Sequence, residues 1–237
     1  VNNINIVNNN FTLLSDFTLN NGKVLEINEG KTLTISSGVT LTNIGTIIDQ
    51  NNTTSGITNK GSIINNNGMI FSNFDITEVD NINNISKNVT LSSNFTLNNG
   101  KVLTLSGGNT LTITSGVTLT NKGTIIDYNW SDYTVPGSGS VHNSIVVNGD
   151  ITNNGNIITN YMDSIVRNGQ PVTLNSDFQL NKDRKLEVED GAILTLGDGV
   201  VLTNYGLIED FNYISGKGIL GSGTITNSDA DDDEATI

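Results

Sequence analysis

The sequence has no cysteine, only two prolines and only three alanines. Without cysteine, the chain forms no disulfide and offers no thiolate ligand to a metal ion. Alanine is the strongest helix former, whereas asparagine and β-branched residues are poor ones. Because the chain holds 39 asparagines and is rich in threonine, isoleucine and valine, its composition argues against a mainly helical protein.

Positive charge is also scarce. Lysine and arginine total 11 against 24 acidic residues, which gives a formal net charge of −13. Binding to a phosphate backbone depends on clustered positive charge, so we expect no nucleic-acid partner. No apolar run approaches the roughly 18 residues that a membrane-spanning helix needs, so we expect no membrane span.

What the sequence does contain is an internal repeat. Residues 11–49 and 89–127 are identical at 29 of 39 positions without a gap, and residues 172–210 form a more diverged third copy. Each copy is followed by a variable stretch and further short strand-like phrases. We therefore divide the chain into three tandem repeats, at about residues 11–87, 88–170 and 171–228.

A finer period lies inside each copy. Glycines recur at spacings of 8, 8 and 7 residues, from Gly22 to Gly45 and again from Gly100 to Gly123. Between them, apolar residues alternate with threonine, as in Leu33-Thr34-Ile35, which puts the apolar side chains on one face of a strand. Strands this short, separated by glycine or asparagine corners that tolerate positive φ, are typical of a solenoid.

The pattern predicts an all-β fold, a right-handed parallel β-helix (β-solenoid) that forms a single domain over residues 1–228. Residues 229–237 form an acidic tail. We expect triangular coils of roughly 20–24 residues, about 10–12 of them, stacked around one apolar column. Asparagines at equivalent corners are expected to form hydrogen-bonded ladders along the stack.

The segments GKTLTISSGVTLTNIGTI (30–47) and GNTLTITSGVTLTNKGTI (108–125) resemble repeats of bacterial surface proteins with right-handed parallel β-helices. Haemagglutinin-like adhesins and autotransporter passenger domains are the families they are most similar to. Asn- and Ile-rich repeats also occur in fibre proteins of large viruses. The resemblance implies a β-helix at an extracellular, cell-surface or virion-surface location.

Parallel β-helices also include polysaccharide lyases and hydrolases, which resemble one another in clustered acids and a catalytic His or Arg. This chain has one histidine, His142, in a Gly- and Ser-rich loop, and two distant arginines, Arg167 and Arg184. General acid–base chemistry needs paired titratable groups within hydrogen-bond reach, and no such pair is visible. We expect no enzymatic activity, and a β-helix polysaccharide lyase ranks below the other hypotheses.

The acidic residues do not form a pattern that predicts a dedicated metal or cofactor site. Asp49, Asp127 and Asp210 end the same strand of each repeat, which favours an Asx-type turn over a column of cations. In the tail, acids at 229, 231, 232, 233 and 234 match no calcium motif, and only opportunistic calcium binding is left open. Threonine pairs such as Thr110 and Thr112 raise an ice-binding alternative, but threonine is also the expected residue on the outer face of a strand.

An aromatic loop provides one candidate binding site. Residues 128–133 contain Tyr128, Trp130 and Tyr133, with Trp130 the only tryptophan. Exposed aromatic residues on a loop suit sugar stacking or a protein contact, while the alternative is that Trp130 folds back onto the coil. This loop supports the alternative hypothesis of a carbohydrate-binding adhesin module, with glycans as partners.

The two ends of the solenoid provide the other candidate. Residues 1–7 are strand-like, and we name Val1, Ile4, Ile6 and Val7 as a candidate assembly strand. Residues 218–226 are strand-like too, and their candidate edge residues are Ile219, Leu220 and Ile225. Unpaired edges that meet head to tail form an open filament. We therefore expect a non-enzymatic structural subunit of an extracellular or surface fibre, a homopolymer whose partner is itself.

Overall fold

The computed structural model describes residues 6–106, 108–128, 144–159, 163–212 and 218–227. Across these residues the chain forms 29 strands and no helix. The strands stack in parallel into a β-solenoid of about 9 turns, which confirms the predicted fold class. Within the described residues, no helix is long and apolar enough to cross a membrane.

The strands fall into three groups, which we call blocks and define by their hydrogen-bonded ladders. Block 1 contains β1 (Ile6–Val7), β2 (Phe11–Leu13), β3 (Phe17–Leu19), β4 (Val24–Ile27), β5 (Leu33–Ile35), β6 (Thr40–Asn43), β7 (Thr46–Asp49), β8 (Ile57–Asn59), β9 (Ser62–Asn65) and β10 (Met69–Phe71). Block 2 contains β11 (Asn84–Ile85), β12 (Val89–Leu91), β13 (Phe95–Leu97), β14 (Val102–Leu105), β15 (Leu111–Ile113), β16 (Thr118–Asn121), β17 (Thr124–Asp127), β18 (Ile145–Val147), β19 (Asp150–Asn153) and β20 (Asn156–Ile158). Block 3 contains β21 (Ser164–Val166), β22 (Val172–Leu174), β23 (Phe178–Leu180), β24 (Lys185–Val188), β25 (Leu194–Leu196), β26 (Val201–Asn204), β27 (Leu207–Asp210), β28 (Ile219–Gly221) and β29 (Thr224–Asn227).

Each coil contributes one strand to each of three faces. In block 1 the ladders are β1-β4-β7-β10, β2-β5-β8 and β3-β6-β9, all parallel. Along a strand, every second side chain points inward and is buried, as in β5, where Leu33 and Ile35 are buried and Thr34 is only partly so. The predicted alternation is thus confirmed, and the buried isoleucine, leucine, valine and phenylalanine side chains form the core.

The number of coils is lower than we expected from the length of the chain. The register Phe11↔Leu33↔Ile57 gives coils of the predicted length, yet the described residues make about 9 turns and not 10–12. The difference arises from the segments between strands. Residues 72–83, for example, lie between β10 and β11 and contain no strand, so they add length between blocks without adding a turn.

Glycine acts at the corners in two different ways. Gly22, Gly30 and Gly38 have φ between +71° and +76°, the left-handed conformation that glycine adopts without strain. Gly45 does not, and here the reason is space: a Cβ atom at this position would lie 2.4 Å from the Lys23 carbonyl oxygen. The sequence period of eight therefore reflects left-handed corners, and the shortened last interval ends at a close approach between coils.

The predicted asparagine ladders are confirmed. The side chain of Asn43 donates to Asn65 at 2.9 Å, that of Asn121 to Asn153 at 2.7 Å, and that of Asn204 to Asn227 at 3.1 Å. The donor asparagine of each pair is fully buried. The three pairs occupy the end of the equivalent strand in the three blocks, so each ladder joins the second and third coils of its block.

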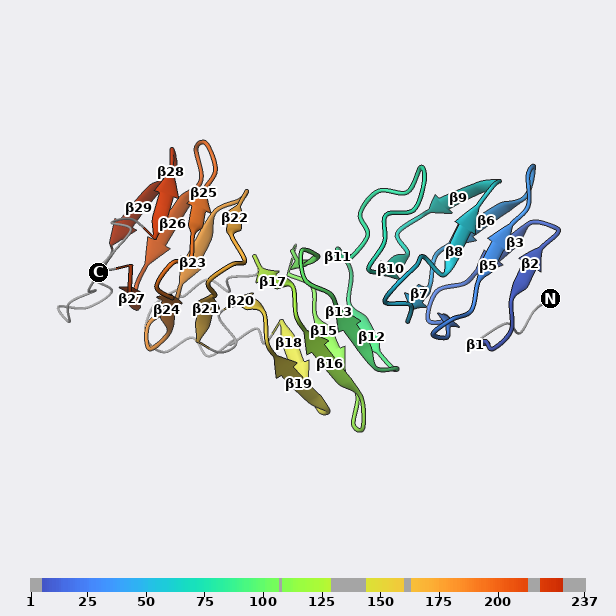
Figure 1. Cartoon of the computed structure of the whole chain (residues 1–237), viewed down its shortest axis with the longest axis horizontal. Coiled ribbons are helices and arrows are strands. Elements are labelled where there is room, and N and C mark those ends of the chain that lie inside the picture. Colours follow the sequence, from blue (N-terminus) through green and yellow to red (C-terminus); the bar gives the residue numbers. More distant parts are fainter. Residues whose placement is uncertain (1–5, 107, 129–143, 160–162, 213–217, 228–237) are drawn as a thin grey trace.

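The core is not one continuous column. Between β10 and β11 no ladder forms, and β20 pairs with β21 in an antiparallel sense at a single residue pair. Figure 1 shows the result: the blocks follow one another along the long axis, the middle one is displaced to one side, and β1 and β29 lie toward opposite ends. Our expectation of a single stack of coils is therefore wrong at these two junctions, and the ladders define the blocks without confirming the sequence repeat boundaries.

Candidate functional site

The junction between blocks 1 and 2 joins the end of one block to the side of the other. Most solenoid strands bury alternate residues, but β7 and β10 are buried on both faces. Their inward residues Ile47 and Ile70 belong to the core of block 1, whereas Ile48 and Phe71 pack in the core of block 2. The outer face of the β1-β4-β7-β10 sheet is thus covered by the open first coil of block 2.

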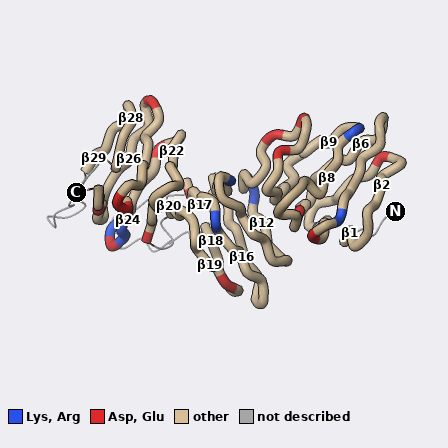
Figure 2. The backbone as a smooth tube through the Cα atoms, in the orientation of Figure 1, with Lys and Arg blue, Asp and Glu red and all other residues tan. Residues whose placement is uncertain are grey.

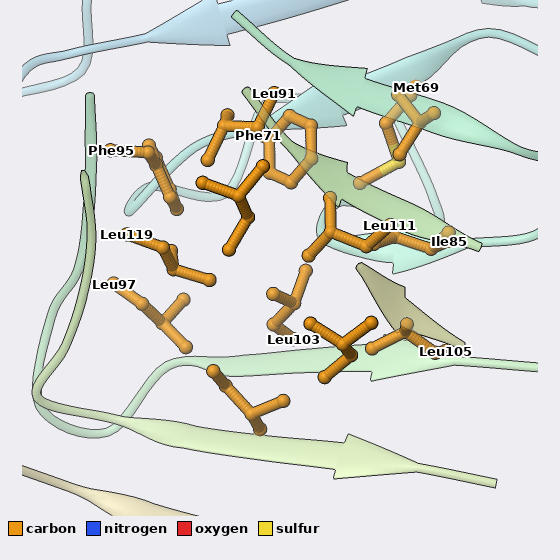
Figure 3. Close-up of a cluster of buried hydrophobic side chains, with 14 of the residues drawn as sticks. Met69, Phe71, Ile85, Leu91, Phe95, Leu97, Leu103, Leu105, Leu111 and Leu119 are labelled. Carbon is orange, nitrogen blue, oxygen red and sulfur yellow. The ribbon is translucent and has the colours of Figure 1, made fainter. Parts of the chain in front are cut away.

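Phe71 lies at the centre of this contact. Its ring packs against Phe95 with centroids 5.4 Å apart and an interplanar angle of 56°. Figure 3 shows Phe71 in one cluster with Leu91 and Phe95 on one side and Met69 on the other, although these residues come from two different blocks. Phe71 and Phe95 are almost completely buried. The first coil of block 2 therefore has its apolar cross-section closed by side chains of block 1.

Polar groups at the same junction complete the exposed backbone edge. The Asn73 side chain donates to the Thr96 carbonyl oxygen at 2.7 Å and accepts from the Asn98 amide at 2.8 Å. It thereby replaces a neighbouring strand along the outer edge of β13. The Lys87 ammonium donates to the Ile44 carbonyl oxygen at 2.6 Å, and burial lowers the pKa of this lysine.

Blocks 2 and 3 meet in the same way. In β17 and β20 the inward residues Ile125 and Ile157 belong to the core of block 2, and the outward Ile126 and Ile158 pack in the core of block 3. The fully buried Asn156 accepts from the Arg167 amide at 2.7 Å. An end-to-side contact between blocks is therefore used twice within the chain.

Tyr128 belongs to this second junction. It is half-buried against the core of block 3, and its hydroxyl accepts a hydrogen bond from the Asn175 amide at 3.3 Å. Burial raises the pKa of the phenol, against the opposite effect of the Asn175 hydrogen bond. The other aromatic residues proposed for sugar stacking, Trp130 and Tyr133, lie outside the described residues, as does His142.

The equivalent face of block 3 is different. Its outer positions on β24 and β27 carry Lys185, Glu187 and Glu209, where block 2 has Val102, Thr104 and Ile126. The Lys185 ammonium lies 2.7 Å from a Glu187 carboxylate oxygen and 3.3 Å from one of Glu209. The hydrogen bond that Lys185 donates to Glu187 is the largest of the effects that raise the pKa of Lys185. Figure 2 shows the two charge colours side by side at β24.

At the N-terminal end of block 1, the first coil has no covering block among the described residues. Phe11 and Phe17 are only half-buried, while Phe95 and Phe178, which occupy the place of Phe17 in the other blocks, are each 1% exposed. Among the described residues, no side chain forms hydrogen bonds with the outer edge of β3 as Asn73 does with the outer edge of β13. Of the proposed assembly strand, Val7 is buried and Ile6 is 52% exposed, and Val1 and Ile4 lie outside the described residues.

At the other end, β27, β28 and β29 each pair with one strand only in the part of the chain that the structure describes. Ile219 and Ile225 are half-buried against the core, and Leu220 is 38% exposed. Ile225 pairs in register with Leu202, which is fully buried because a coil covers it on both sides. The two ends of the solenoid thus present comparable apolar cross-sections.

Two of the three repeated aspartates, Asp49 and Asp210, close turns, whereas the buried Asp127 accepts hydrogen bonds from the hydroxyls of Ser144 and Thr159. The Asp49 carboxylate is buried and accepts from the amides of Asn51 at 3.1 Å and Gly56 at 2.9 Å. The exposed Asp210 accepts from the equivalent amides, those of Asn212 at 3.0 Å and Gly218 at 2.9 Å. This is the geometry expected of an Asx-type turn. Among the described residues, no group of three or more His, Cys, Asp or Glu side chains could hold a metal ion.

Asp210 also gives a pH-dependent prediction. Burial alone raises its pKa, but the hydrogen bonds from Asn212 and Gly218 outweigh burial and lower the pKa below 3.8. A lowered folded-state pKa stabilises the fold above the unfolded-state pKa, and this contribution is lost as the pH falls through the folded-state value. We expect Asp210→Asn to lower the free energy of unfolding at neutral pH. This difference from wild type should shrink as the pH falls below about 4 and disappear once the pH is below the folded-state pKa of Asp210. Urea unfolding of both proteins measures this, and a pH-independent difference would contradict it.

Two shallow hollows lie where block 2 meets the side of block 1. One has a volume of about 350 Å³ and is lined by Ile6, Lys23, Glu26 and Ser92, among others, and the second, of about 190 Å³, includes Lys87 and Asn88. Two of their charged groups take part in the junction: Lys87 donates to the Ile44 carbonyl oxygen, and Glu26 accepts from the Ser93 hydroxyl. Of the two arginines, Arg167 donates to the Gly155 carbonyl oxygen at 3.0 Å and pairs with Glu189 at 2.9 Å.

Comparison of the chain with protein-family models, with curated proteins and with solved structures finds no match.

Proposed function

We propose that the chain is a non-enzymatic structural subunit of an extracellular or surface fibre. In this proposal the fibre lengthens when the first coil of one copy stacks on the last coil of the next. The observation that carries it is the contrast between equivalent residues: Phe17 is half-buried at the open end, whereas Phe95 and Phe178 are buried where a block covers them.

Backbone pairing supports the same arrangement. The strands of the first coil, β1, β2 and β3, and those of the last, β27, β28 and β29, each leave one edge unpaired within the described residues. Strand addition at such an edge supplies main-chain hydrogen bonds, and the facing apolar cross-sections supply hydrophobic burial. A head-to-tail contact of this kind uses two different surfaces, so it does not close after two copies and produces an open filament.

The test compares two single substitutions in block 1. Phe17→Asp places a charge on the open face of the first coil, whereas Ile64→Asp places one on β9, where Ile64 is already 51% exposed. We expect wild type and Ile64→Asp to form filaments in electron micrographs. Phe17→Asp should require a concentration higher by about tenfold or more, because docking would bury an unpaired carboxylate.

Circular dichroism and thermal unfolding confirm that each variant keeps the fold. A wild-type chain that sediments as a monomer at every concentration tested would refute the fibre. Filaments that form equally well with Phe17→Asp would refute the role of the first coil.

A further inference from the structure

We infer that a second copy docks on the last coil of block 3 in one rotational setting, with its β2 placed on β28 and its β3 placed on β29. This setting continues two ladders of block 3 from one chain into the next. The existence of the contact rests on the proposed function. What is added is which strands meet, and why the contact forms at the end of block 3 and not at the end of block 1.

The end of block 1 is closed by its own chain. The segment between β10 and β11 passes next to β8, where the Thr77 carbonyl oxygen accepts a hydrogen bond of 3.1 Å from the Asn59 side chain. In the same segment Ile76 is 4% exposed and belongs to the core of block 1, and Val79 and Ile82 pack against that core. In Figure 1 the segment lies beyond β8 and β9. These three branched side chains form a plug over the last coil.

Burial at equivalent positions distinguishes this closed end from the end of block 3. Ile57 and Ile63, the inward residues of β8 and β9, are 5% and 6% exposed beneath the plug. Ile219 and Ile225 occupy the same register positions in β28 and β29 and are only half-buried. No segment of the described residues covers them as the plug covers block 1. The last coil of block 3 therefore presents an apolar cross-section that needs a cover.

A second copy supplies a better cover than the tail of the same chain. Residues 228–237 include five acidic residues, and their only large apolar side chain is Ile237. The first coil of block 1 instead presents Phe11 and Phe17, both half-buried. Burial of these rings against Ile219 and Ile225 removes apolar surface from water on both sides of the contact.

The corner after β2 marks the same coil as a contact surface. Leu14 at this corner is 78% exposed, whereas the equivalent residues of blocks 2 and 3 are the polar Ser92 and Asn175. In the proposed setting Leu14 faces the corner between β28 and β29, where Gly221 and Gly223 leave backbone open to an apolar contact. The equivalent corner of block 1 carries a lysine.

Three rotational settings keep the strands of two triangular coils parallel, and the inward side chains favour one. With β2 on β28 and β3 on β29, Phe11 lies on Ile219 and Phe17 on Ile225. Both contacts extend columns that are apolar in all three coils of block 3. Either other setting places β2 or β3, each with two inward apolar residues, on β27, which ends at the exposed Asp210 carboxylate. An apolar strand there would remove the charge from water. In the favoured setting this place falls to β1, with one inward apolar residue among those described.

Cysteine cross-linking of the intact chain tests the setting, because the wild-type sequence contains no cysteine. Thr12 and Leu220 are the outward residues of β2 and β28. Strands that pair in parallel lie about 4.8 Å apart, which is within the range of a disulfide. We expect Thr12→Cys/Leu220→Cys to form disulfide-linked multimers on mild oxidation, visible on a non-reducing gel. Adding Phe17→Asp should abolish them, because it places a charge in the contact.

The matched controls keep the first cysteine and move the second to other outward positions. Thr12→Cys with Thr226→Cys or Glu209→Cys tests the two other settings, in which β2 lies on β29 or β27. Thr12→Cys with Val146→Cys or Thr58→Cys tests the last coils of blocks 2 and 1, at the register position of Leu220. We expect each control to cross-link about tenfold less, or lower still, because its sulfur atoms lie outside the range of a disulfide. Circular dichroism checks that every variant keeps the fold.

Sedimentation of the same proteins under reducing conditions separates this inference from the fibre. Filaments that cross-link through a control pair, or that leave the pair at 12 and 220 unlinked, refute the setting and leave the fibre in place. A chain that stays monomeric at every concentration tested refutes the fibre, and the setting falls with it. Filaments that cross-link only at 12 and 220, in a Phe17-dependent way, support both.

Discussion

Replacing Phe71 by alanine is expected to lower the free energy of unfolding by about 3–5 kcal/mol, the usual cost of removing a large buried aromatic side chain. Phe71 is fully buried, contacts Phe95, and comes from a different block than most of its neighbours. The cavity cannot collapse easily, because the surrounding side chains are held by two sets of strands. Urea unfolding followed by far-ultraviolet circular dichroism measures the loss.

Phe17→Ala is the matched control for this prediction. The substitution removes the same type of side chain from the first coil of block 1, where Phe17 is only half-buried. We expect this change to cost less than half as much as Phe71→Ala. Equal losses for the two variants would show that the junction contributes nothing beyond the packing inside each coil.

The second large effect is expected at the other junction. Ile126→Glu places in block 2 the side chain that Glu209 supplies in block 3. Ile126 is 3% exposed and packs in the core of block 3, so the new carboxylate would be buried without a partner. We expect a loss of about 3–5 kcal/mol. Hydrogen exchange should show it first as lost protection in β21 to β23, the strands that dock on this face.

Val102→Glu is the control for this substitution. Val102 occupies an outward position of the same sheet, in β14, but it is 45% exposed because block 3 does not cover it. A charge there should change the free energy of unfolding by about 0.5 kcal/mol or less. If Val102→Glu and Ile126→Glu behave alike, the outer face of β17 is not a docking face.

End-to-side docking has a consequence for stability. In a continuous solenoid each coil contacts only its neighbours, and unfolding spreads along the stack. Here the core of block 2 also contains Ile48, Met69 and Phe71 of block 1, so loss of either block exposes the core of the other. The junctions therefore couple the unfolding of neighbouring blocks, although β20 and β21 are the only described strands that pair across a junction.

Much of the fold could be predicted because its determinants are local. The alternation in Leu33-Thr34-Ile35 sets the inward and outward faces, Gly22 and Gly30 set left-handed corners, and repetition of the pattern sets the register. The buried asparagines followed from their equivalent corner positions. The open ends could be proposed because strand-like sequence continues into the first and last described coils.

The sequence by itself determined a parallel β-solenoid with asparagine ladders, because period-two alternation and regularly spaced glycines restrict each residue independently of distant contacts. Only the tertiary structure decided that the coils form three blocks joined end to side. The segment Thr-Ile-Ile-Asp reads as an ordinary strand at 46–49 and 124–127, and its doubled isoleucine was the one signal that both faces are covered. What covers the second face lies in the next block, beyond any local pattern.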